Sequence, residues 1–179
     1  MYRRYANVET NLFPEIADKF QSKGVLDPVD LWAILSWKAN RSKTKHRRRM
    51  EQIAAAPFLE AAASFSSDIS KGATPKDRLR AVMDKWDFRL PTATAILTIL
   101  YPDEFTVYDY RVCGQIGGFH NLRNQTFSDH LWTQYQAFKL AAIEAAPRGL
   151  TLREVDHYHW GKSWHADAIK DIGNASPIS

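Results

Sequence analysis

The aspartate in the segment VYDYRV, residues 107–112, is a side chain that could carry a reaction. Asp109 stands at the expected start of a short helix, where the positive end of the helix dipole keeps a carboxylate ionised. Such a carboxylate can stabilise a developing positive charge, and it can orient or deprotonate an attacking water molecule. The alternative is a structural acid that caps the helix and pairs with Arg111. We expect Arg111 to brace the helix or this carboxylate.

Lys38, in the segment SWKANRSK, is a second residue that could take part in chemistry. Its amine becomes a nucleophile if Trp37 and its neighbours remove it from water. Lysines in such segments more often serve as surface charges or phosphate contacts. Both interpretations of Lys38 therefore stay open at the level of sequence.

Three histidines lie close together in the segment HYHWGKSWH, residues 157–165. His157 and His159 are two residues apart, so a helix would point them to different faces. We therefore expect packing and surface roles for these histidines and predict no metal site. Trp160 and Trp164 of the same segment remain candidates for an aromatic pocket.

The segment KWDFRLP, residues 85–91, ends at a proline that is expected to open a helix. A helix start presents unpaired backbone N–H groups and a positive dipole end, and both suit a phosphate. Side chains around this corner can add hydroxyl donors and charge. The candidates for such a DNA contact are Lys85, Arg89, Thr92 and Thr94.

The net charge of +4 is concentrated in one stretch, RSKTKHRRR, residues 41–49. This stretch holds six of the 24 Lys and Arg residues, and the remaining 18 stand against 20 Asp and Glu. A local basic patch is typical of a contact with a polyanion such as DNA. The alternative is a solvated helix start or loop without a partner. The candidate contacts are Arg41, Lys43, Lys45, Arg47 and Arg48.

Helix signals recur along the chain, whereas the alternating pattern of strands is almost absent. We predict an all-α protein of about eight helices that forms a single unit over residues 1–179. Helix starts are marked by Asp27-Pro28, Thr74-Pro75, Pro91, Asp109, Ser128 and the capping box Thr151–Glu154. The last helix is expected to stop at Gly161. The finer expectations are a hairpin of helices at about 76–101, an aspartate-bearing helix at about 107–117 and a loose tail at about 173–179.

Two segments, LPTATAIL at 90–97 and VYDYRV at 107–112, resemble the motifs of the helix-hairpin-helix DNA glycosylases, the endonuclease III-like superfamily. In that family LPGVGxKTA opens the second hairpin helix, and VDxxVxR carries the essential aspartate. When the TA of the family motif is superposed on Thr92-Ala93, Asp109 falls at the family's spacing, 18 residues after Pro91. The resemblance implies an all-α fold, DNA binding through the hairpin and Asp109 as the catalytic residue.

The resemblance also implies hydrolysis of the bond between a base and its sugar, after the nucleotide has been flipped out of the stack. Flipping calls for an aromatic-lined pocket, and the aromatic candidates here are Trp37, Tyr108, Tyr110, Trp160 and Trp164. For Tyr108 and Tyr110 the alternative, which we favour slightly, is a place in the core or on a helix surface. No cofactor is expected. Repair and defence against modified foreign DNA are both compatible with such an activity.

The chain departs from the family pattern at two points. Its hairpin corner has no glycine, so a side chain such as Arg89 would have to replace backbone contacts with phosphate. Pro91 stands where the family has a lysine and cannot form a Schiff base, which favours a monofunctional glycosylase. The alternatives are a DNA-binding module without catalysis and a helical protein that binds an acidic protein partner.

The composition is that of a folded protein, with 45% apolar and 12% aromatic residues. Cys113 is the single cysteine, so an internal disulfide is excluded and a reducing compartment is favoured. The N-terminus lacks the apolar run of a secretory signal, and no segment is apolar enough to span a membrane. We expect a soluble, cytoplasmic monomer, associated with the nucleoid if the protein is bacterial.

Overall fold

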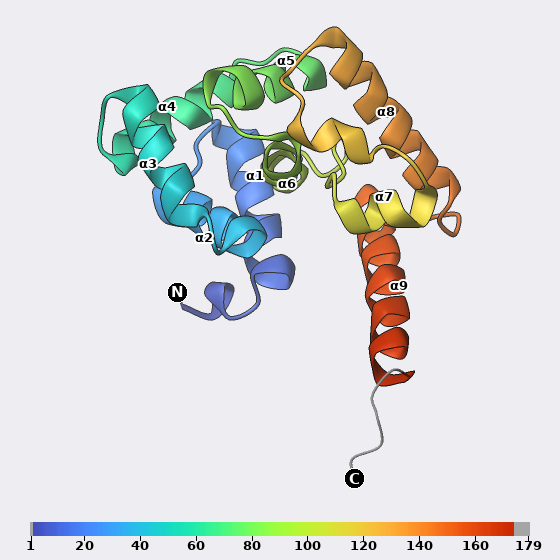
Figure 1. Ribbon diagram of the computed structural model, residues 1–179. Coiled ribbons are helices and arrows are strands. Elements are labelled where there is room, and N and C mark those ends of the chain that lie inside the picture. Colours follow the sequence, from blue (N-terminus) through green and yellow to red (C-terminus); the bar gives the residue numbers. More distant parts are fainter. Residues whose placement is uncertain (1, 174–179) are drawn as a thin grey trace.

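The structure is a computed structural model, and it describes residues 2–173 (Figure 1). Every regular element in this range is helical, as predicted. Short 3-10 or π-helical turns are η1 (Tyr2–Tyr5), η2 (Val8–Leu12), η3 (Ala81–Lys85) and η4 (His120–Asn124). The α-helices are α1 (Phe13–Lys23), α2 (Pro28–Ala39), α3 (Lys43–Ala54), α4 (Phe58–Ser70), α5 (Pro75–Arg80), α6 (Leu90–Leu100), α7 (Tyr110–Ile116), α8 (Asp129–Glu144) and α9 (Leu152–Gly173).

The helix starts follow the capping signals of the sequence. The side chain of Asp27 accepts the N–H of Val29 at 2.8 Å, and Ser128 accepts that of Leu131 at 3.1 Å. Each cap satisfies one of the N–H groups that a helix start leaves unpaired. Thr74 caps α5 in the same way, and Thr151 with Glu154 forms the expected capping box before α9.

Helix α6 is the centre of the molecule. Its residues 93–100 are all buried, and α6 packs against both α1 and α2. Figure 1 shows α6 between α1–α4 on one side and α7–α9 on the other. Because α6 is buried around its whole circumference from residue 93 to residue 100, it can pack against helices on more than one side. Residues brought by α2 and α7 can thereby face each other.

Two boundaries differ from those expected. Helix α9 continues through Gly161 to Gly173, because a single exposed glycine costs a helix only about 1 kcal/mol and no competing cap ends it there. After Arg80 the α-helix gives way to the wider π-helical turn η3. The chain then turns at Asp87, whose φ of 51° lies in the left-handed region. Of the tail expected at 173–179, Gly173 belongs to α9 and residues 174–179 lie outside the described residues.

Candidate active site at Lys38 and Asp109

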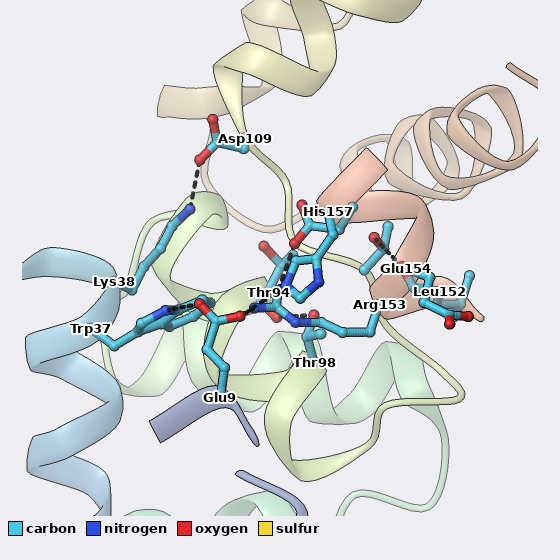
Figure 2. A network of polar contacts seen from close by, with 12 residues as sticks. Glu9, Trp37, Lys38, Thr94, Thr98, Asp109, Leu152, Arg153, Glu154 and His157 are labelled. Carbon is cyan, nitrogen blue, oxygen red and sulfur yellow. Dashed lines mark hydrogen bonds and ion pairs between the residues drawn. The ribbon is translucent and has the colours of Figure 1, made fainter. Parts of the chain in front are cut away.

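The structure brings together the two residues that the sequence nominated for chemistry. The Nζ atom of Lys38 lies 2.8 Å from Oδ2 of Asp109 (Figure 2). Asp109 is the N-cap of α7, and its Oδ1 accepts the backbone N–H of Arg111 at 3.0 Å. The two side chains are only 15% and 16% exposed. The carboxylate of Asp109 therefore caps α7 and pairs with Lys38 at the same time.

Buried hydrogen bonds hold the segment that carries Asp109. The hydroxyl of Thr94 on α6 accepts the N–H of Tyr108 at 2.9 Å, next to Asp109 in the chain. The hydroxyl of Tyr135 on α8 accepts the N–H of Thr106 at 3.1 Å and donates to its carbonyl oxygen at 2.7 Å. Backbone groups fixed in this way leave little freedom to the carboxylate that follows them.

Thr94 does not have the role expected from the sequence, and of the two interpretations of Tyr108 the structure supports the place in the core. Thr94 is fully buried, and its hydroxyl also donates to the carbonyl oxygen of Leu90, so it cannot contact DNA. Tyr108 is buried as well, and its hydroxyl donates to the carbonyl oxygen of Phe119 at 2.7 Å. Tyr108 therefore packs in the core and lines no base pocket. Both residues position Asp109 instead.

A cavity of about 290 Å³ opens beside the Lys38–Asp109 pair. The aromatic rings of Trp37 and Trp160 belong to its wall. A cavity of this volume lies at the lower end of the range for small-molecule sites. Its lining combines four separate parts of the chain: Glu9, Trp37, Lys38, Val107, Asp109, Arg153, Asp156, His157 and Trp160.

Glu9 is the hub of a polar network at the far side of this cavity (Figure 2). Its carboxylate accepts the indole N–H of Trp37 at 2.7 Å, Arg153 at 2.7 Å and His157 at 2.8 Å. Burial opposes the ionisation of Glu9, but these hydrogen bonds and charges outweigh it and hold its pKa below the ordinary value. The guanidinium carbon of Arg153 lies 4.9 Å from the centre of the Trp37 ring. The orientation of Trp37 is thus fixed from two sides.

Asp156 is the third carboxylate of the cavity and the most deeply buried. Burial raises its pKa to about 6, although the charges of Arg153 and Lys38 pull in the opposite direction. Arg153 Nη1 lies 2.6 Å from Oδ2 of Asp156. Sequence reasoning did not nominate Glu9, Arg153 or Asp156, because only the tertiary fold places η2 and α9 beside α2.

Arg111 does not brace the carboxylate with its side chain. Its guanidinium contacts Asp167 at 2.5 Å and Ser163 at 3.2 Å, both on α9. Only the backbone N–H of Arg111 reaches Asp109. The side chain therefore ties α7 to α9.

The hairpin corner offers fewer phosphate donors than the sequence suggested. The backbone N–H groups of Thr92 and Ala93 both bond to the carbonyl oxygen of Arg89, and Pro91 has no N–H. The exposed Arg89 donates to the carbonyl oxygen of Asn124 at 3.2 Å, and Lys85 pairs with Asp68. Side chains rather than the helix start must therefore supply any phosphate contact at this corner.

The basic stretch forms the start of α3 and adjoins this corner. Arg49 lies 2.9 Å from both the carbonyl oxygen and the carboxylate of Asp87, which places α3 beside the hairpin. Arg47 lies 3.8 Å from Glu51. Of the remaining candidate contacts, Arg41, Lys45 and Arg48 are exposed and Lys43 is half-buried.

The remaining residues that the sequence nominated differ in their exposure. Tyr110, Trp160 and Trp164 are exposed, and His159 is buried, donating to the carbonyl oxygen of Ala142 at 2.8 Å.

Within residues 2–173 no group of three acidic, His or Cys side chains could hold a metal ion. In the same range no helix is long and apolar enough to cross a membrane.

Comparison of the chain with protein-family models, with curated proteins and with solved structures found no match.

Proposed function

We propose that the protein is a DNA glycosylase-like enzyme that hydrolyses the N-glycosidic bond of a flipped, damaged or modified base. The observation that carries this proposal is the Lys38–Asp109 pair at the edge of a cavity walled by Trp37 and Trp160. A carboxylate that is partly buried yet borders an open cavity can meet a sugar. The aromatic walls suit the base attached to that sugar.

The chemistry needs one carboxylate and one water molecule. As the bond between C1′ and the base nitrogen breaks, positive charge develops on the sugar, and the carboxylate of Asp109 stabilises it. Water then adds to C1′, and Asp109 accepts its proton, while the departing base takes up a proton from solvent. Lys38 holds the carboxylate of Asp109 in its orientation through the 2.8 Å contact. This scheme needs no cofactor.

Two further features support DNA as the substrate. The segment α5–η3–α6 covers the residues whose sequence resembles a helix-hairpin-helix, and Arg89 is exposed at its corner. The basic start of α3 is tied to the same corner by Arg49. A surface formed by the hairpin and α3 would present several cations to a DNA backbone while the cavity holds one nucleotide.

The deciding experiment is the substitution Asp109→Asn. Asparagine is as good an N-cap as aspartate, so α7 should be preserved while the charge is lost. We expect base release from lesion-bearing or hypermodified DNA to fall at least about 100-fold, with DNA affinity unchanged. Release is scored as alkali-labile strand breaks.

Asp27→Asn is the matched control, because Asp27 is also an N-cap aspartate but lines no part of the cavity. It should leave base release intact. Base release that survives Asp109→Asn would refute the assignment of Asp109. DNA binding without base release from any substrate would favour the alternative, a non-catalytic DNA-binding module. Negligible DNA affinity at low salt would favour a protein-interaction domain.

A further inference from the structure

We propose that the exposed aromatic residues Tyr110, Trp160 and Trp164 form a stacking surface for unpaired bases. The preferred substrate is then DNA with a single-stranded region, such as a bubble or a free strand, rather than a fully paired duplex. This inference rests on the proposed function for the chemistry in the cavity. It adds a substrate class that the cavity alone does not define.

The three aromatic side chains are largely open to solvent. Tyr110 is 60% exposed, Trp160 46% and Trp164 54%. Trp160 and Trp164 are four residues apart on α9, so they lie on the same face of the helix. Trp160 also lines the cavity, and Trp164 extends the surface by one turn away from it. Figure 1 shows this half of α9 projecting past the other helices.

Arg111 organises the inner part of this surface. Its guanidinium carbon lies 5.5 Å from the centre of the Tyr110 ring and 5.6 Å from that of Trp160. The contacts of Arg111 with Asp167 and Ser163 hold the guanidinium in place near both rings. Two rings and a fixed cation form a pre-organised platform, and nucleic acid bases stack well on such groups.

The positive charge of the basic stretch 41–49 favours nucleic acid over an apolar protein as the partner of the aromatic surface. The basic stretch 41–49 begins three residues after Lys38, which lines the cavity together with Trp160, and its Arg41, Lys45 and Arg48 are exposed. Exposed aromatic rings together with a basic path are typical of sites for single-stranded nucleic acid. A paired duplex buries the faces of its bases and cannot use the rings. The hairpin start, with its N–H groups engaged internally, also offers little to anchor a duplex.

The test measures the affinity of the full chain for three labelled DNAs of one sequence: a single strand, a duplex with a central bubble and a full duplex. Fluorescence anisotropy is recorded in the Asp109→Asn background, so that base release does not interfere. We expect the single strand and the bubble to bind at least tenfold more tightly than the duplex. Trp164→Ala should weaken single-strand binding roughly tenfold and leave duplex binding unchanged.

Tyr158→Ala is the matched control, because Tyr158 is an exposed aromatic residue of α9 on a different face. It should leave all three affinities unchanged. Equal affinity for duplex and single strand, or indifference to Trp164→Ala, would overturn the inference. So would a Trp164→Ala variant that dissociates a dimer in sedimentation without losing DNA affinity, because the surface would then bind protein.

Base release, measured separately on the same DNAs with the wild-type chain, keeps the two proposals apart. Release from the duplex with indifference to Trp164→Ala would retain the glycosylase and refute the stacking surface. Single-strand binding that depends on Trp164, without base release from any DNA, would retain the stacking surface and refute the glycosylase.

Discussion

Asp109 uses both of its carboxylate oxygens within the protein. One accepts a backbone N–H at the start of α7, and the other accepts the ammonium group of Lys38. Both contacts fix the orientation of the carboxylate. In the proposed reaction the carboxylate faces the sugar, and Lys38 acts as a positioning residue through Asp109.

Replacing Lys38 tests this positioning role. Lys38→Gln should lower base release about 10- to 100-fold, because Asp109 loses the cation that orients it, whereas Lys38→Arg should retain most of the activity. Borohydride added during the reaction should trap no covalent complex with DNA, since the paired ammonium group is not a nucleophile. A trapped complex that disappears in Lys38→Arg would identify the amine of Lys38 as the nucleophile instead.

At the scale of elements, the positive charges in the first turns of α3 destabilise that helix. Cations near a helix start oppose its dipole, and the first turn of α3 contains no acidic residue. Arg49 has a structural role at the hairpin corner. Within residues 2–173 no ion pair engages the exposed cations Arg41, Lys45 and Arg48, and for this reason we propose them as DNA contacts.

Neutralising these three cations should therefore weaken DNA binding without harming the fold. The triple variant Arg41→Gln, Lys45→Gln, Arg48→Gln should bind DNA more weakly, and the slope of log affinity against log salt should fall by about one for each phosphate that the protein no longer neutralises. The control replaces three exposed cations elsewhere by Gln: Lys23, Lys71 and Arg148. If both triple variants change the slope equally, general charge and not α3 determines binding.

At the scale of the whole molecule, Glu9 joins the N-terminal turns to α2 and α9 across the cavity. Asp156 lines the same cavity, and its contribution to stability changes with pH in the opposite direction. The lowered pKa of Glu9 contributes stability that is present above its ordinary value of 4.5 and is lost as pH falls through the folded value. Asp156, with a raised pKa, binds its proton more tightly in the folded state, so stability is lost as pH rises.

The substitution Asp156→Asn isolates this second effect. Between the ordinary pKa of 3.8 and the folded value of about 6, the stability of the wild type should fall relative to the variant by about 2 kcal/mol. The measurement is urea unfolding of both proteins at several values of pH from 4 to 7. A difference in unfolding free energy that stays constant over this range would show that Asp156 keeps its charge in the folded state.

Local signals predicted the elements well because they act over a few residues. The caps at Asp27, Thr74 and Ser128 and the capping box at Thr151 all lie where the sequence placed them. Gly161 was misleading, since a glycine ends a helix only when the geometry of a cap accompanies it. Thr94 was misplaced, and Tyr108 was left with two possible roles, because a polar side chain near a motif looks the same in sequence whether it faces solvent or the core.

The sequence by itself determined the all-helical fold, the helix starts, the basic stretch and the nomination of Asp109 and Lys38. The fold class, the helix starts and the basic stretch follow from periodicity, capping and charge, which are local, whereas Asp109 was nominated as catalytic by the resemblance of its motif to that of the glycosylases. Only the tertiary structure decided that Lys38 and Asp109, 71 residues apart, form one ion pair. It alone added Glu9, Arg153 and Asp156 to the site. Contacts between distant residues depend on how α2, α7 and α9 assemble around α6, and no short stretch of sequence encodes that assembly.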